Sequence, residues 1–280
     1  MTRIFLLPAV LFLSLTAIIS SAAEDSFEIN TTLMRSTFKI ADEKSAGTVF
    51  ILAKPVPSNP KLANYVLVTA NHVLNDMEGD VAVLFLRRKV GDTFQKIPWP
   101  IKIRLDGRPV WTTHPDADVA VMYISIPTDA DVTPLPTDLL ATDEILKKFN
   151  VHPGDRLSCL GYPLAAEANG AGFPILRSGQ IASFPLTPTK TVKTFAFDFN
   201  VFEGNSGGPV YLSDSNRIYE GTTNIGSVQF LMGLVSQQWS VKESYKTRNE
   251  EGKHNYPLGI AIVINASLIR EALDLLPSPP

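Results

Sequence analysis

Short apolar or alternating runs of residues, separated by turn-forming residues, recur along nearly the whole of this chain. The runs are rich in Val, Ile, Phe and Tyr, and Gly, Pro, Asn or Asp separates many of them, which is typical of β-strands joined by turns. They cover residues 36–40, 48–53, 65–69, 81–86, 101–103, 119–124, 156–160, 175–183, 192–199, 209–212, 230–236 and 258–264. About six strands therefore fall in each half, with no long amphipathic helix between them. This pattern predicts an all-β fold of two six-stranded antiparallel β-barrels.

A stretch rich in Pro, Asp and Thr, residues 127–154, separates the two predicted barrels and is typical of a linker that crosses the surface. Within it, residues 145–149 favour a short helical turn. One longer helix is predicted at the end of the chain, where Asn265 can cap its start and Pro277 ends it. Its apolar side chains fall on one face at helical spacing: Leu268, Ile269, Ala272, Leu273 and Leu276.

The N-terminal residues have the pattern of a secretory signal peptide. Arg3 supplies the positive start, residues 4–19 are almost wholly apolar, and small residues at 21–23 offer a cleavage site. The alternative is a membrane anchor, for which the apolar run is short. We therefore expect residues 1–23 to be removed on export. Because Cys159 is the only cysteine, no intramolecular disulfide can form, which favours a bacterial secreted or periplasmic protein.

The mature chain would then consist of an N-terminal β-barrel with its linker, residues 24–150, and a C-terminal β-barrel with the terminal helix, residues 151–280. Apolar residues make up 45% of the chain and the net charge is −3, ordinary values for a globular protein with a core. A basic excess that would indicate nucleic-acid binding is missing from the sequence. We expect no stable membrane insertion after signal removal, no cofactor and no bound metal.

The sharpest chemical signal is the segment 204–209, Gly-Asn-Ser-Gly-Gly-Pro. Glycine on both sides of Ser206 lets the backbone turn tightly and approach a substrate closely. The amides of Gly204 and Ser206 would then supply the two N–H donors that a tetrahedral oxyanion needs. The alternative interpretation of this segment is an ordinary glycine-rich turn.

A serine hydroxyl needs an adjacent base, and the base needs a carboxylate that orients it. His72 directly follows an apolar strand, which would fix its imidazole on a rigid element. The remaining histidines lie in polar loops or before a turn and are expected to be solvated: His114, His152 and His254. Asp118 leads directly into the apolar run 119–122, so we prefer it as the orienting carboxylate over Asp116, for which a surface turn is expected.

At these three places the chain resembles the trypsin-like, or chymotrypsin-fold, serine peptidases. Their motifs are Thr-Ala-x-His, Asp-[Ile/Val]-Ala and Gly-[Asp/Asn]-Ser-Gly-Gly-Pro, and both the order His, Asp, Ser and the separations match. The resemblance implies a serine endopeptidase that acts on polypeptides with the catalytic triad His72, Asp118 and Ser206. It implies that the Asp lies at the end of the first barrel and the Ser in the second.

A finer resemblance, to the Deg/Htr-type bacterial branch, rests on segments 47–50, 161–163, 178–181 and 258–262, and covers residues 36–276. The chain stops after the terminal helix, so no PDZ domain is expected. Digestive members of the family carry Asp where this chain has Asn205, and that Asp pairs with a newly cut N-terminus. Asn cannot offer this charge, so we expect signal removal alone to yield the active protein.

The resemblance also implies a specificity pocket. Asn200 would lie at its base, and a neutral base disfavours basic side chains because a desolvated cation would lack a partner. The pocket walls would include Leu234, Val235, Ser236, Gly259 and Ala261. The long polar stretch 241–256 lies between the wall strands, and we expect it to be a loop that tunes substrate choice or, alternatively, a solvated loop.

Three alternatives remain at this point. Cys159 could be the nucleophile, but it lies inside a predicted strand with no histidine in a matching motif, and a buried thiol behaves as a small hydrophobe. The chain could be a non-catalytic module that binds polypeptides on a protease fold, or an esterase-like hydrolase on the same barrels. All three members of the predicted triad are present, which favours the protease.

Overall fold

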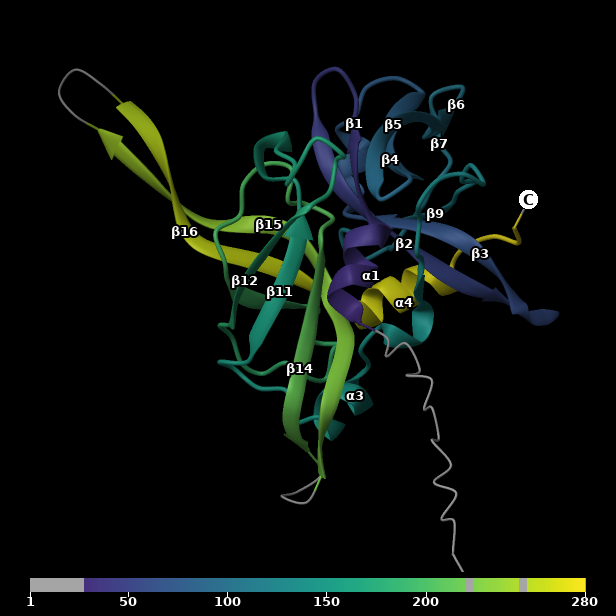
Figure 1. The fold of residues 1–280 in the computed structure, drawn as a ribbon. Coiled ribbons are helices and arrows are strands. Elements are labelled where there is room, and N and C mark those ends of the chain that lie inside the picture. The colour runs from purple at the N-terminus through teal and green to yellow at the C-terminus, as the bar shows by residue number, and fades with distance from the viewer. Residues whose placement is uncertain (1–27, 220–223, 247–250, 280) are drawn as a thin grey trace, which may run out of the picture.

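The computed structural model describes residues 28–219, 224–246 and 251–279. The predicted signal peptide lies outside the described residues. About half of the described residues lie in β-strands. The strands form two halves that share one hydrophobic core (Figure 1). In the part of the chain that the structure describes, every helix is too short or too polar to cross a bilayer.

The first half forms one sheet with open edges, antiparallel except where β10 joins it. Its strands follow the order β5-β4-β1-β2-β3-β9-β8, and β10 pairs with β2 in parallel. The bounds are β1 (Thr37–Ala41), β2 (Ala46–Val56), β3 (Asn59–Thr69), β4 (Val81–Val90), β5 (Thr93–Lys102), β8 (Thr112–Thr113), β9 (Ala120–Tyr123) and β10 (Leu135–Pro136). The prediction of a closed first barrel is therefore wrong. Closure requires the two edge strands to pair, and the edge strand β8 spans only two residues.

The second half is a closed six-stranded barrel, as predicted. Its strands pair in the cyclic order β11-β12-β13-β16-β15-β14, and all neighbours are antiparallel. The bounds are β11 (Arg156–Gly161), β12 (Ile175–Ile181), β13 (Thr194–Asp198), β14 (Pro209–Tyr219), β15 (Asn224–Lys246) and β16 (Glu251–Asn265). Apolar side chains such as Phe195, Phe197 and Val263 are buried in its core.

Strands β15 and β16 continue beyond the barrel as a long hairpin that projects from the body of the molecule (Figure 1). Val241 pairs with Tyr256 and Lys246 pairs with Glu251. The sequence predicts a loop over 241–256, but residues 241–246 and 251–256 form paired strands, so the prediction is wrong for the described part of this segment. Its polar side chains hid the strand, because a hairpin outside a core needs no apolar face.

Helices cover the junction of the two halves. The predicted C-terminal helix is present as α4 (Ala266–Asp274), and it packs against β9 and β15. Asn265 stands at its N-cap position, but its side-chain amide donates to the Val192 carbonyl at 2.6 Å instead of capping the helix. The Arg270 guanidinium donates to the Leu140 carbonyl at 3.0 Å, so α4 also holds the connection between the halves.

The remaining elements are short. The connection between the halves contains η1 (Thr137–Leu139) and α3 (Asp143–Lys148), and α3 confirms the predicted helical turn. Helix α1 (Ile29–Ser36) was not predicted; its Ile29 and Leu33 are fully buried in the core. The others are α2 (Asn71–Asn75), β6 (Arg104–Leu105), β7 (Arg108–Pro109) and η2 (Pro163–Ala165).

Candidate active site

His72 and Asp118 meet because β3 and β9 are paired neighbours in the first sheet, with Thr69 opposite Ala120. His72 lies in α2, which begins directly after β3, and Asp118 lies just before β9. The Nδ1 atom of His72 is 2.6 Å from Oδ2 of Asp118, and the backbone N–H of His72 donates to Oδ1 at 2.9 Å. One carboxylate therefore holds both the ring and the backbone of the histidine.

These contacts set the charge of both groups. The hydrogen bond to Asp118 raises the pKa of His72 above its ordinary value, and it outweighs the opposing effect of burial. Burial alone would raise the pKa of Asp118, but hydrogen bonds from His72 and Ser236 outweigh it and leave that pKa below its usual range. With Nδ1–H facing the carboxylate, neutral His72 carries its lone pair on Nε2 and can act as a base there.

Ser206 lies in the loop before β14 and is partly exposed. Its backbone carbonyl accepts a hydrogen bond from Thr48 of β2 at 3.0 Å, which fixes the serine loop against the first half. Its hydroxyl donates to the Ser236 carbonyl at 3.0 Å. Among the hydrogen bonds of the described residues, none joins Ser206 to His72, and the Ser206 hydroxyl is instead held by the Ser236 carbonyl in this conformation.

Ser236 connects two of the predicted triad residues, Asp118 and Ser206. Its hydroxyl donates to Oδ2 of Asp118 at 2.6 Å, and its carbonyl accepts the Ser206 hydroxyl. The sequence suggested Ser236 only as part of a pocket wall. Its contact with Asp118 depends on how the second barrel meets the first sheet, and no local motif marks it.

The glycines of the serine loop are required by close packing. Gly204 has φ +89°, and a Cβ there would lie 2.2 Å from the Tyr162 carbonyl oxygen. Gly207 has φ +83°, and its Cβ would lie 2.1 Å from the Thr48 carbonyl oxygen. No other residue type fits these positions without moving the backbone.

The two predicted oxyanion donors lie in this loop. In the described part of the chain, the amides of Gly204 and Ser206 donate to no protein acceptor. The Glu203 carbonyl accepts a hydrogen bond from the Leu164 amide at 2.6 Å. Because a trans peptide places C=O and N–H on opposite sides, this bond also sets the direction of the Gly204 N–H.

Asn205 is buried behind the loop, with 1% of its surface exposed. Its Oδ1 would lie 2.9 Å from a Cβ on Gly161, so the two residues are in close contact. In the described residues its Nδ2 atom has no hydrogen-bond partner. The neutral side chain thus stands in an enclosed place where an aspartate would need a cation.

The residues expected to form the specificity pocket are not equally accessible. Asn200 is exposed, and its Oδ1 would lie 2.7 Å from a Cβ on Gly259, which has φ +71°. These two residues therefore lie side by side as expected. In contrast, three of the predicted wall residues are fully buried in the core and present no surface in this conformation: Leu234, Val235 and Ala261.

The competing residues are placed elsewhere. The Asp116 carboxylate is largely exposed and lies 3.2 Å from the Lys193 ammonium. His114 is only 4% exposed and its Nε2 lies 3.2 Å from Oε2 of Glu271 on α4, so the expectation that His114 is solvated is wrong. Burial raises the pKa of Cys159 to about 12, which keeps its thiol protonated. His152 is exposed, and the side chain of His254 lies outside the described residues.

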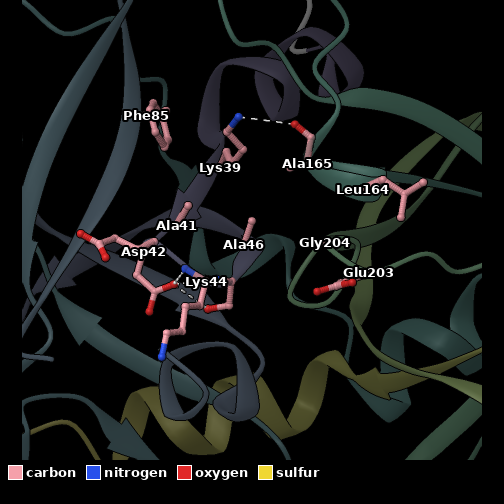
Figure 2. Close-up of a pocket in the computed structure, with 12 residues that line it drawn as sticks. Lys39, Ala41, Asp42, Lys44, Ala46, Phe85, Leu164, Ala165, Glu203 and Gly204 are labelled. Carbon is pink, nitrogen blue, oxygen red and sulfur yellow. Dashed lines mark hydrogen bonds between the residues drawn. The ribbon is translucent and has the colours of Figure 1, made fainter. Parts of the chain in front are cut away.

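A cavity of about 410 Å³ opens beside Gly204 (Figure 2). It is lined on one side by the connection between β1 and β2, Ala41–Ala46, and by Phe85 of β4. On the other side it is lined by Leu164, Ala165, Glu203 and Gly204. The cavity thus extends from the first sheet to Gly204, one of the two predicted oxyanion donors, and its lining shares no residue with the expected specificity pocket.

Several solved structures are similar to this chain at low sequence identity. The inactive form of Rv3671c from M. tuberculosis H37Rv, a serine-to-alanine mutant, is 17% identical, with 90% of this chain and 92% of that chain covered and a TM-score of 0.43. Serine protease AL20, from an extremophilic microorganism, is 14% identical, with 86% and 95% covered and a TM-score of 0.44. Protease Anisep from Arthrobacter nicotinovorans is 13% identical, with 85% and 93% covered and a TM-score of 0.45.

The chain also matches a protein-family model. No curated protein matches the chain. The family model of the trypsin-like peptidase domain matches residues 56–218, which is more than half of the sequence. The matched range contains His72, Asp118 and Ser206. The chain therefore belongs to the trypsin-like peptidase family and is a serine endopeptidase.

Proposed function

We propose that this protein is an exported peptidase that cleaves polypeptides by an acyl-enzyme mechanism, in which Ser206 is the nucleophile, His72 the base and Asp118 the orienting carboxylate. The observation that carries the proposal is the pair of contacts between Asp118 and His72, to the ring Nδ1 and to the backbone N–H. They hold the ring so that Nε2 is available as a proton acceptor. The neighbouring serine loop supplies two amide donors without protein partners in the described chain.

In the first step, the Ser206 hydroxyl turns about its Cα–Cβ bond, leaves the Ser236 carbonyl and donates to Nε2 of His72. Its oxygen attacks the scissile carbonyl while the proton passes to His72. The amides of Gly204 and Ser206 stabilise the negative charge that develops on the substrate oxygen. Protonated His72 then gives its proton to the leaving amine, and water resolves the acyl-enzyme by the same route.

Substrate would lie across the loop at Ser206. The side chain on the acyl side approaches Asn200 and Gly259, where the neutral amide favours uncharged residues. The leaving segment extends over Gly204 toward the cavity lined by the β1–β2 connection. The N-terminal signal pattern supports a secreted or periplasmic location, and the segments that resemble the Deg/Htr-type branch support a bacterial envelope protease.

A phosphonyl fluoride that reacts with activated serines tests the mechanism. We expect it to label the full mature chain, residues 24–280, at Ser206. Ser206→Ala should abolish labelling and casein cleavage while the thermal unfolding midpoint is retained. His72→Ala should cost about as much activity, and the double variant little more, because triad members act as a unit. Appreciable cleavage by folded Ser206→Ala protein would contradict the assignment.

The hydrogen bond from Ser206 to the Ser236 carbonyl favours one second candidate, a polypeptide-binding module without catalysis. In such a module the hydroxyl would stay with that carbonyl, and the histidine would never activate it. Labelling separates the two candidates. A folded wild-type protein that binds unfolded polypeptides but neither reacts with the phosphonyl fluoride nor cleaves them would support the binding module.

A further inference from the structure

Arg87 is the largest side chain that is completely buried in the described structure. It lies on β4 in the first sheet, far along the chain from the serine loop. Its guanidinium lies between the aromatic rings of Phe38 and Phe173, 4.3 Å from the centroid of each. A buried cation is costly unless every group around it compensates the lost hydration. The contacts of the guanidinium therefore indicate what this buried cation does in the fold.

The guanidinium joins the two halves of the molecule through backbone carbonyls. It donates to Met34 of α1 and Thr37 of β1, which belong to the first half, each at 2.9 Å. It also donates at 2.9 Å to Gly172, which lies in the loop between β11 and β12 of the second barrel. The hydroxyl of Tyr162 donates to the same Gly172 carbonyl at 3.0 Å.

The loop that Arg87 holds, residues 162–173, is docked on the first sheet at several points. The Phe173 ring packs edge-on against Phe94 of β5, with 5.1 Å between the centroids. Lys39 and Lys96 both pair with the Glu167 carboxylate. The loop connects two strands of the second barrel, but its side chains and backbone are held by residues of the first sheet.

The same loop carries the contacts that orient the Gly204 amide, one of the two oxyanion donors. The Leu164 amide holds the Glu203 carbonyl at 2.6 Å, and the Tyr162 carbonyl packs against the Cα of Gly204. The Glu203–Gly204 peptide plane therefore depends on where the loop lies. A rotation of that plane would turn the Gly204 N–H away from the substrate oxygen.

We propose that Arg87 is a positioning residue for the oxyanion site: by fixing the loop 162–173 to the first sheet, it holds the Gly204 amide in the direction that catalysis requires. This inference rests on the proposed function. Arg87 touches neither the triad nor the substrate, and its effect reaches Gly204 through Gly172, Tyr162 and Leu164. Precise donor placement matters because the loss of one oxyanion donor costs about 10²–10³ in kcat.

Removal of Arg87 also takes a donor from three carbonyls, of which Gly172 keeps the Tyr162 hydroxyl, so some stability will be lost whatever the role of Arg87. Arg217 offers a matched control for that loss. It lies on β14, is 8% exposed, and likewise donates to two backbone carbonyls, those of Phe149 and Asn150. It also pairs with Asp155 at 2.6 Å. These contacts lie near α3, away from the serine loop.

The test compares wild type, Arg87→Met, Arg87→Lys and Arg217→Met in the full mature chain. Hydrogen–deuterium exchange is followed in residues 162–173 and 203–208, and kcat and KM are measured on a peptide amide. For Arg87→Met we expect faster exchange in both segments and a kcat about 10²–10³ lower, with KM within about threefold of wild type. Arg87→Lys should recover part of kcat. Arg217→Met should lower the unfolding midpoint but leave kcat and both segments unchanged.

Unchanged exchange and unchanged kcat in folded Arg87→Met would overturn the proposal. It would also be overturned if Arg217→Met lost kcat together with stability, because the loss of kcat would then reflect a general loss of stability. If Arg87→Met does not fold, Phe173→Leu decides, because it removes one ring of the cation site and the Phe94 contact. Full kcat and wild-type exchange in that variant would refute the inference. If wild type itself neither turns over substrate nor labels, the proposed function fails, while the exchange comparison still tests the anchoring by Arg87.

Discussion

Gly204→Ala is the substitution that the structure constrains most sharply. Gly204 has φ +89°, where an alanine backbone is strained by about 1–3 kcal/mol. In addition, the new Cβ would lie 2.2 Å from the Tyr162 carbonyl oxygen, well inside the roughly 3.5 Å at which nonbonded heavy atoms attract. The backbone at 204 must therefore shift by about 1 Å, and a displacement of that size costs about 10²-fold in rate.

The matched control is Gly154→Ala. Gly154 has φ +91°, but no heavy atom lies within 4 Å of a Cβ built there, so this variant carries the backbone strain without the clash. Steady-state kinetics on a peptide amide and thermal unfolding would be measured for both. We expect Gly154→Ala to lose about 1–3 kcal/mol of stability and Gly204→Ala at least as much, but only Gly204→Ala to lose about 10²–10³ in kcat. If Gly204→Ala kept wild-type kcat, the Gly204 amide would not be an oxyanion donor.

Two further predictions concern pH and substrate choice. The base must be neutral, and the pKa of His72 is raised, so kcat/KM should fall as the pH drops through a midpoint above the ordinary histidine value of about 6.5. If kcat/KM in a pH–rate profile fell only below that value, the result would contradict the hydrogen bond between His72 and Asp118. Cleavage should favour uncharged, mainly aliphatic residues on the acyl side because Asn200 is neutral. A dominance of arginine or lysine among cut sites mapped in a denatured proteome would refute this preference. By the same reasoning, Asn200→Asp should shift the preference toward basic residues.

The pattern of apolar residues predicted most of the strands but not whether each sheet closes into a barrel. Alternating apolar residues marked the strands of both halves, and the second barrel closes as expected. The first sheet stays open because its edge strand β8, Thr112–Thr113, is too short to pair with β5. Closure depends on the register of pairing across the whole sheet, which local periodicity does not contain.

His114 and Arg87 show why burial of polar residues escaped the sequence. Each lies in a segment whose charge suggests solvent, and each is buried where groups from distant parts of the chain accept hydrogen bonds from it or pair with it. For His114 the partner is Glu271 on α4, and for Arg87 the partners include Gly172 in a loop of the other half. A buried polar group is tolerated only when such partners exist, and they are supplied by segments far apart in the chain.

The sequence by itself determined the types of residue that the candidate site uses: a histidine after a strand, an aspartate directly before another strand, and a serine between glycines. These signals are local, because strand periodicity and the positive φ angles of Gly204 and Gly207 are properties of a few neighbouring residues. Only the tertiary structure decided that Ser236 joins Asp118 to Ser206, and that the first sheet anchors the loop orienting Gly204. Those contacts depend on how the two halves pack, and packing is decided by the whole chain at once.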